Sequence, residues 1–397
     1  MALANTTQTY GGVTKTFHWL TVLLIFTLIP LGIVANALPY ETSEELAQKA
    51  FLFSIHKTLG VFTFFVALAR ILWAYSQPKP GLLHPDRKME SMAAETVHWL
   101  LYGSLLLVPL SGWVHHAATT GFAPIWWPFG QNLPFVPKDE GIANTFAGLH
   151  VVFERVLVLS LFLHIAGALK HHFIDKDVTL KRMWFGQVRV PEVASEHSLV
   201  LPFGVALSAW AAAILIGGSL GVYQGKGSAV EAAQLEQVQS GWQVEDGTLG
   251  IEVVQLGSAV QGSFTDWTAA IDFDPDVAEG QSGTVDVTVS VGSLELGSVK
   301  EQAMGADYFN VAEFPTANFV ADIVTLPEGY EAQGNLTIKG TTIPARLPFT
   351  LQLDGPSAAM EGQLIIDRRD FAIGMGMTDE SSLGFDVVVK VTLNAIR

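Results

Sequence analysis

The stretch GLHVVFERVLVLSLFLHIAG, residues 148–167, decides how the first half of the chain folds. It is apolar almost throughout, and about 20 residues in a helix span the hydrocarbon core of a bilayer. Two histidines, His150 and His164, nevertheless interrupt it, with Glu154 and Arg155 between them. Ionisable side chains are costly inside a membrane and commonly mark a functional site. The pattern therefore predicts a membrane-spanning helix whose ionisable side chains belong to a functional site.

Four further apolar runs have the length of a membrane-spanning helix. Together with the run around residues 148–167, the five runs cover residues 17–38, 52–75, 95–117, 144–172 and 199–222. The chain is 49% hydrophobic and has a mean hydropathy of +0.35, which is high for a water-soluble protein. No signal-cleavage pattern follows the first run, so we expect it to be retained. These observations predict a multi-pass membrane protein.

Basic residues are concentrated in alternate loops and set the expected orientation. They precede the first run, lie between the second and third, and follow the fourth: Lys15, Lys79, Arg87, Lys88, Lys176, Lys181, Arg182 and Arg189. The positive-inside rule therefore places the N-terminus in the cytoplasm. With five spans, everything beyond about residue 223 is expected on the opposite side of the membrane.

Charge divides the chain at about the same position. Residues 1–223 contain 14 Lys and Arg against 13 Asp and Glu, and the remainder contains 8 against 25, which gives net charges of +1 and −17. Nucleic acid is therefore not an expected partner of the acidic part. The chain has no cysteine, which excludes disulfides, iron–sulfur clusters, thiolate haem ligands and covalent haem attachment. Any haem would be held non-covalently by His or Met.

Beyond residue 240 the hydrophobic period changes from helical to two. TVDVTVSVG (284–292) places Val285, Val287, Val289 and Val291 on one face, and DVVVKVTL (386–393) is similar. Turns containing glycine or proline separate such segments, which predicts an all-β antiparallel barrel or sandwich of about 155 residues.

The sequence thus predicts three parts. Residues 1–190 form a transmembrane domain and residues 241–397 form the β domain. Residues 191–240 contain the fifth membrane helix, about 199–222, and a polar segment, 224–241, that reads as a linker or short helix.

The histidines of the membrane runs pair by depth. His150 and His164 lie within about 40° on one helix face and roughly 21 Å apart along the axis, so one metal site cannot use both. At matching depths, His18 begins the first run and His56 begins the second. We call His18 with His164 the inner pair and His56 with His150 the outer pair. Bis-histidine ligation across a helix bundle is a common way to hold haem b, so the sequence predicts two haem irons with these four ligands.

A single histidine at the end of a membrane helix is commonly an interfacial side chain that binds nothing. Four histidines that lie in two pairs at matching depths favour metal ligation instead. Other polar residues near these levels are weaker candidates. Arg70 and Arg155 are expected to contact haem propionates or to support the ligands. His98 could be an alternative ligand at the inner level, a propionate or quinone contact, or an interfacial histidine. Lys57 and Arg155 lie near the outer pair, where their charge would favour an anionic reactant.

Residues 8–185 resemble the bacterial cytochrome b561 family. The resemblance rests on FHWL (17–20), IHKTLGVFTFFVALARILW (55–73), HWLLYGSLLLVPLSGWV (98–114) and GLHVVFERVLVLSLFLHIAGALKHHFIDKDVTLKRM (148–183). It implies a four-helix bundle in the bacterial inner membrane, two haem b groups held by the inner and outer pairs, and electron transfer with ubiquinone. Some members are similar to superoxide oxidases, which pass an electron from periplasmic superoxide to ubiquinone.

Residues 241–396 resemble the YceI-like family. The matching stretches are GSFTDWTAAIDFDP (262–275), YFNVAEFPTANFVA (308–321), GNLTIKGTTIPARLPF (334–349) and IDRRDFAIGM (366–375). The resemblance implies a periplasmic lipocalin-like barrel that binds an isoprenoid chain, such as a polyprenyl quinone. The aromatic residues expected to line such a tunnel, or else to form a packed core, are Phe264, Phe309, Phe319, Phe349 and Phe371.

The expected function is that of a membrane-bound di-haem cytochrome. It would act as an oxidoreductase between the ubiquinone pool and a periplasmic reactant, with superoxide as the specific candidate. Two alternatives stay open on the sequence. One is a membrane-anchored isoprenoid-binding protein without catalysis, which would not need four histidines in its helices. The other is an electron donor to a periplasmic redox protein, docked through the acidic surface.

Overall fold

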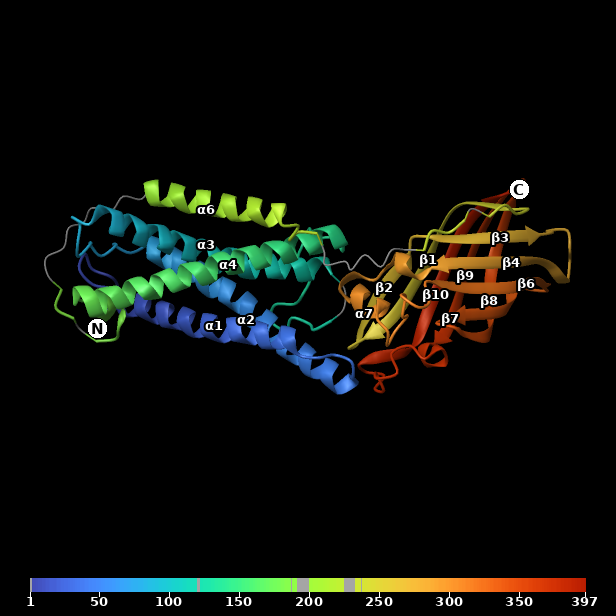
Figure 1. Ribbon diagram of the computed structural model, residues 1–397, viewed down its shortest axis with the longest axis horizontal. Coiled ribbons are helices and arrows are strands. Elements are labelled where there is room, and N and C mark those ends of the chain that lie inside the picture. The colour runs from blue at the N-terminus through green and yellow to red at the C-terminus, as the bar shows by residue number, and fades with distance from the viewer. Residues whose placement is uncertain (1, 120–121, 187, 191–199, 225–232, 237) are drawn as a thin grey trace. The chain divides into compact units, whose positions relative to one another are not determined.

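The computed structural model describes residues 2–119, 122–186, 188–190, 200–224, 233–236 and 238–397 (Figure 1). Two compact units make up the chain: one comprises Met1–Ala37, Phe51–Thr119 and Pro124–Gly225, and the other comprises Leu38–Ala50, Thr120–Ala123 and Lys226–Arg397. The first unit is helical and the second is largely β. Half of the expected linker, residues 225–232 and 237, lies outside the described residues, as do residues 191–199.

Five helices in the described ranges are long and apolar enough to cross a membrane. They are α1 (Gly12–Ala37), α2 (Ser43–Tyr75), α3 (Lys88–Ala118), α4 (Glu140–Lys170) and α6 (Val200–Ser219). The expected membrane region is thus confirmed. Helix α2 begins nine residues before its apolar run because the polar segment SEELAQKAF also favours a helix, with Glu44 and Glu45 in the first turn, where acidic residues stabilise the helix dipole. Two short elements follow α4: a π-helix (His171–Asp175) and α5 (Thr179–Met183).

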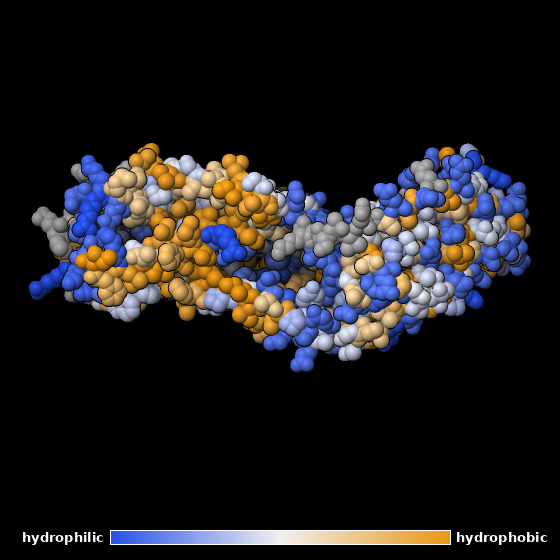
Figure 2. Space-filling view, in the orientation of Figure 1, coloured by the Kyte–Doolittle hydropathy of each residue, from blue (hydrophilic) through white to orange (hydrophobic). Residues whose placement is uncertain are grey.

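On the face that Figure 2 shows, the surface of the helical unit is largely apolar over the middle of its helices. Exposed side chains there include Leu23, Phe26, Leu72, Phe162 and Leu215. Large apolar side chains facing outward along helices of this length match the hydrocarbon core of a bilayer.

The fifth membrane helix packs against the bundle. Helix α6 lies along α3 and α4 (Figure 1). The Trp210 ring of α6 occupies the place that a Cβ at Gly103 of α3 would fill, so only glycine allows this approach. The rings of Trp99 and Phe203 pair nearby, 4.9 Å apart between centroids. Small residues at such contacts let membrane helices pack closely without a hydrophobic driving force.

The second unit contains a ten-stranded, strongly curled antiparallel sheet (Figure 1). Its strands are β1 (Gln243–Gln255), β2 (Ser258–Phe264), β3 (Trp267–Phe273), β4 (Gly280–Ser290), β5 (Leu294–Glu295), β6 (Thr316–Leu326), β7 (Gly329–Ile338), β8 (Thr341–Asp354), β9 (Ser357–Asp367) and β10 (Leu383–Ile396), and a short helix, α7 (Lys300–Met304), lies between β5 and β6. The order is β3-β4-β6-β7-β8-β9-β10-β1-β2-β5.

The seam of the sheet is closed next to β1. An antiparallel bridge joins Trp242 to Ile271 of β3, and the Trp242 indole Nε1 donates a hydrogen bond to the Phe273 carbonyl at 2.9 Å. The sheet therefore wraps around an interior, which confirms the expected lipocalin-like barrel. Alternation of inward and outward side chains places Val285, Val287 and Val289 of β4 on the interior face, as their period of two predicts.

Candidate functional site

The inner pair brings together the first and fourth membrane helices. The imidazole centroids of His18 on α1 and His164 on α4 lie 6.2 Å apart, with the ring planes inclined by 58°. Two imidazoles that ligate one metal ion from opposite sides, at about 2.0 Å each, have centroids roughly 6 Å apart. The inner pair therefore has the spacing of axial ligands. His98 of α3 lies at the same level, with its centroid 5.2 Å from that of His164.

The outer pair is held by backbone carbonyls. His56 on α2 donates its Nδ1–H to the Leu28 carbonyl at 3.1 Å, and His150 on α4 donates its Nδ1–H to the Val108 carbonyl at 2.8 Å. An imidazole that donates from Nδ1 keeps its lone pair on Nε2, which is the arrangement of a metal ligand oriented by its surroundings.

Two glycines make room for the outer pair. A Cβ at Gly32 of α1 would lie 2.9 Å from His56 Cε1, and a Cβ at Gly112 of α3 would lie 3.0 Å from His150 Nδ1. Both distances are shorter than an ordinary van der Waals contact. The four helices thus form a close-fitting cradle around these imidazoles. Sequence reasoning missed both glycines, because nothing in an apolar run shows which glycine faces a partner helix.

An apolar layer separates the two levels. Ile25 of α1, Ala67 of α2 and Leu105 of α3 form a buried cluster, and Leu161 of α4 packs against it. Leu161 lies between His150 and His164 along α4. The 14-residue spacing of those histidines sets the two levels roughly 21 Å apart along the helix. The bundle therefore carries imidazoles at two levels, with an apolar layer between them.

The remaining predicted residues are spread over different environments. Lys57 is buried in α2 beside His56, and the Arg70 guanidinium lies over the Tyr102 ring, 5.4 Å from its centroid. The Arg155 side chain is 76% exposed and forms an ion pair with Glu154 at 3.5 Å, although the two point about 100° apart on the helix. Arg155 thus lies on the outside of the bundle.

A third group of side chains lies at the end of α4. Asp177 Oδ2 accepts hydrogen bonds from His84 Nε2 at 3.0 Å and from His171 Nδ1 at 2.6 Å. Burial alone would raise the pKa of Asp177, but hydrogen bonds from Thr179 and His171 lower it to about 2. Sequence reasoning missed this group because His84 comes from a loop far from His171 in the chain.

The barrel of the second unit encloses an apolar cavity of about 280 Å³. Phe264, Phe309, Phe319 and Phe349 line it, and their contact with a ligand stays a prediction. Phe371 does not line it: this ring is fully buried in a core cluster with Ile338, Ile366 and Ile373. The inward face of the sheet therefore supplies both a tunnel wall and a packed core.

Polar groups border this cavity near the ends of β1 and β9. The Tyr308 hydroxyl accepts a hydrogen bond from Gln302 at 2.8 Å, and burial raises the pKa of Tyr308 to about 12. Arg368 donates to the backbone carbonyls of Ile373, Gly374, Met377, Leu383 and Gly384. Within the described residues, the buried Gln255 Oε1 has no hydrogen-bond partner. Strand periodicity alone does not reveal such inward polar side chains.

Comparison with known proteins places both units. Residues 9–186 match the family described as prokaryotic cytochrome b561. Cytochrome b561 homolog 2 of Escherichia coli K12 is 34% identical over 184 residues, which cover 46% of this chain and 95% of that protein.

The chain belongs to the prokaryotic cytochrome b561 family.

Membership in the cytochrome b561 family implies haem b and electron transfer. The imidazoles of this family member fit such a group: one pair has the spacing of axial ligands, and the other is oriented through Nδ1 with glycines beside it. Another relative is the probable superoxide oxidase CybB of Yersinia pestis, 25% identical over 167 residues, which cover 42% of this chain and 90% of that protein.

The second unit of this cytochrome b561 family member is a YceI-like domain, matched over residues 242–395. Among solved structures, BcnA of Burkholderia cenocepacia is 30% identical, with 37% of this chain and 95% of that chain covered and a TM-score of 0.35. A membrane cytochrome unit and a YceI-like unit are thus joined in one polypeptide.

Proposed function

We propose that this protein is a di-haem b cytochrome that transfers electrons between the ubiquinone pool and a periplasmic reactant. His18 and His164 would hold one haem, and His56 and His150 the other. The observation that carries the proposal is the 6.2 Å spacing of the His18 and His164 rings between two membrane helices. When bound, haem supplies one-electron transfer through its iron.

The chain's own residues prepare the two levels. The carbonyls of Leu28 and Val108 fix the ring orientation of the outer pair, so that each Nε2 is available as a ligand. The apolar layer around Leu105 excludes water between the levels. A low-dielectric, water-free interior lets the surrounding protein groups set the electronic properties of a bound redox group.

The proposed orientation follows from the basic loops. Lys79, Arg87 and Lys88 between α2 and α3, and the basic residues after α4, favour a cytoplasmic location for that end of the bundle. The N-terminus then lies in the cytoplasm of a bacterial inner membrane. With five membrane helices, the YceI-like domain would then lie on the periplasmic side.

Superoxide is the periplasmic reactant that we favour. One relative is a probable superoxide oxidase, and Lys57 is buried next to His56 in α2. The −17 charge beyond residue 223 would slow an approaching anion. Salt at about 0.15 M screens charges beyond roughly 8 Å, so charges adjacent to the outer pair have the larger effect.

The barrel would bind an isoprenoid, such as the tail of a quinone. Its cavity of about 280 Å³ is apolar and lies just below the range of about 300–1,000 Å³ typical of ligand pockets. The YceI-like match supports this ligand class. An isoprenoid-binding barrel on a quinone-linked cytochrome would keep the substrate of the membrane unit on the same polypeptide.

Stopped-flow spectroscopy of the full-length protein in nanodiscs tests the proposed function. Superoxide should reduce the haem faster than superoxide dismutates spontaneously, and ubiquinone should then reoxidise it. A rate no faster than dismutation would exclude superoxide as the reactant. Failure of both ubiquinone and ubiquinol to change the haem spectrum would exclude the quinone-linked function itself.

A further inference from the structure

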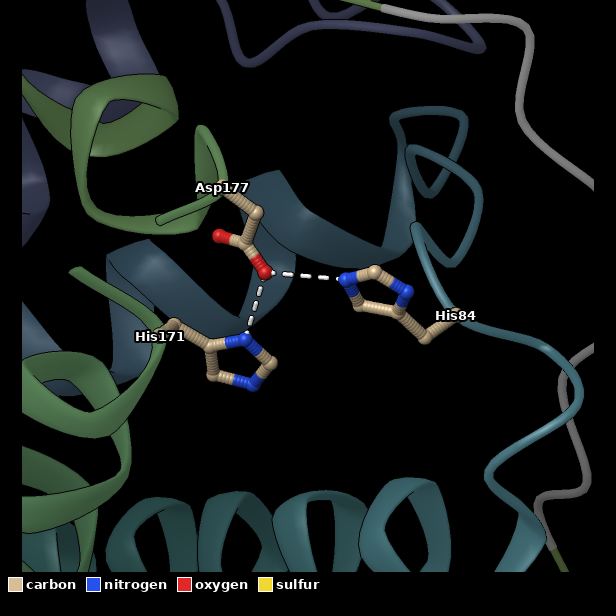
Figure 3. Close-up of side chains that lie close together, drawn as sticks. All are labelled: His84, His171 and Asp177. Carbon is tan, nitrogen blue, oxygen red and sulfur yellow. Dashed lines mark hydrogen bonds and ion pairs between the residues drawn. The ribbon is translucent and has the colours of Figure 1, made fainter. Parts of the chain in front are cut away.

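The side chains of His84, His171 and Asp177 converge at the end of α4 (Figure 3). One nitrogen from each imidazole and one carboxylate oxygen all lie within 4.8 Å of one another. In Figure 3, a ring nitrogen of His84 and one of His171 both point at the same oxygen of the Asp177 carboxylate. Donor atoms this close together can ligate a single metal ion.

The chain path that creates this group is unusual. Helix α4 ends in a π-helix from His171 to Asp175, and Lys176 then adopts a left-handed conformation with φ of 53°. The reversal returns Asp177 to the side of His171. Short π-helical turns are rare and occur frequently at functional sites. The His84 ring, from the loop before α3, stacks on the His171 ring with the planes 11° apart.

The donor atoms are held by further contacts. Asp177 Oδ1 accepts a hydrogen bond from the Thr179 backbone at 2.8 Å, which leaves Oδ2 directed at the histidines. His171 Nε2 lies 3.3 Å from Glu90 Oε1, on the side of the ring opposite to Asp177. Metal-binding histidines commonly have a carboxylate beside their second ring nitrogen.

The basic side chains near the group, Lys170 and Arg87, pair with carboxylates other than Asp177. Lys170 pairs with Glu90 and Asp175, and Arg87 also pairs with Asp175. Within the part of the chain that the structure describes, no Lys or Arg forms an ion pair with Asp177. The side chains of His84, His171 and Asp177 are 31%, 19% and 11% exposed. Water and ions can therefore reach the group.

We propose that His84, His171 and Asp177 form a binding site for a divalent first-row transition-metal ion, for which Zn²⁺ is the best match. Two imidazoles and a carboxylate suit zinc and its neighbours, whereas Mg²⁺ and Ca²⁺ prefer oxygen ligands throughout. Three protein ligands leave a fourth position for water. Binding replaces the protons shared between Asp177 and the imidazoles, and the proposal does not depend on the electron-transfer function.

Calorimetry with Zn²⁺ tests the site. The haem-loaded, full-length protein without a histidine tag, after treatment with a chelator, should bind one Zn²⁺ per chain. His84→Ala and Asp177→Asn should each weaken binding at least tenfold, and Glu90→Gln by about tenfold. The matched control is His172→Ala, which removes the neighbouring histidine outside the group and should bind as the wild type does. A hundredfold excess of Mg²⁺ should not compete.

Two further measurements test whether the variants are folded and which atoms bind the metal. Unchanged haem spectra and melting temperatures show that the variants are folded. Zinc-edge X-ray absorption should report nitrogen and oxygen ligands at about 2.0 Å, including two imidazoles. Absence of Zn²⁺ binding by the wild type, or equal binding by the folded His84→Ala and Asp177→Asn variants, would overturn the proposal.

Discussion

The imidazoles of His18 and His164 face each other across the bundle, 6.2 Å apart between ring centroids. They belong to the first and fourth membrane helices, so their proximity depends on the packing of the whole bundle. The imidazoles of the outer pair are oriented by hydrogen bonds instead. His56 and His150 each donate Nδ1–H to a backbone carbonyl. The Nδ1 atoms of His56 and His150 are therefore satisfied within the membrane region.

The glycines beside the outer pair should be sensitive to a single methyl group. Gly32→Ala or Gly112→Ala places a Cβ about 3 Å from a histidine ring and should cost about 1–3 kcal/mol unless the ring moves. We expect lower haem content or a shifted midpoint potential for the outer haem only, measured by redox titration. Gly60→Ala on α2 is the matched control, because a Cβ there meets nothing within 4 Å. Identical titrations for Gly32→Ala and Gly60→Ala would contradict the cradle.

Trp210 should anchor the fifth helix to the bundle. Trp210→Ala removes the ring that fills the space beside Gly103, and loss of a large packed aromatic costs about 3–5 kcal/mol in protein cores. We expect a clear fall in the melting temperature of the detergent-solubilised protein. Leu215→Ala on the same helix removes an exposed side chain and should leave it nearly unchanged. Equal effects of the two changes would argue against specific docking of α6.

Filling the barrel should displace its lipid. Ala332 of β7 lines the cavity, so Ala332→Phe should reduce co-purifying isoprenoid several-fold in mass spectrometry of extracts, while the haem spectrum stays unchanged. Val320→Phe on β6 is the control, because Val320 is exposed on the outer face. A melting curve establishes that each variant is folded. Retention of the wild-type amount of lipid by folded Ala332→Phe would show that the cavity is not the binding site.

The sequence predicts those features that depend on period and order along the chain. Apolar run lengths give the five membrane helices, and alternation on β4 gives the inward valines. The period of apolar residues does not show which side of a helix faces which neighbour. The contacts of Gly32 and Gly112 with histidines, and the exposure of Arg155, therefore become visible only once the helices are packed.

Contacts made where the chain reverses direction are a second feature that the sequence does not predict. A π-helix and a left-handed residue return Asp177 to His171, and nothing in the local pattern shows that His84 joins them. In the barrel, four of the five predicted phenylalanines line the cavity, and Phe371 departs because it follows β9 in a 3₁₀ turn that folds into the core. Both cases depend on tertiary contacts between distant segments.

Haem stoichiometry is the most direct measurement of the central claim. A pyridine haemochromogen assay of the purified protein should find two haem b per chain, and His150→Ala and His164→Ala should each retain one. His115→Ala is the control and should retain two, since this imidazole bonds through Nδ1 to the Ala143 carbonyl and belongs to neither pair. A wild-type protein without haem b, or unchanged haem content after both His150→Ala and His164→Ala, would contradict the account.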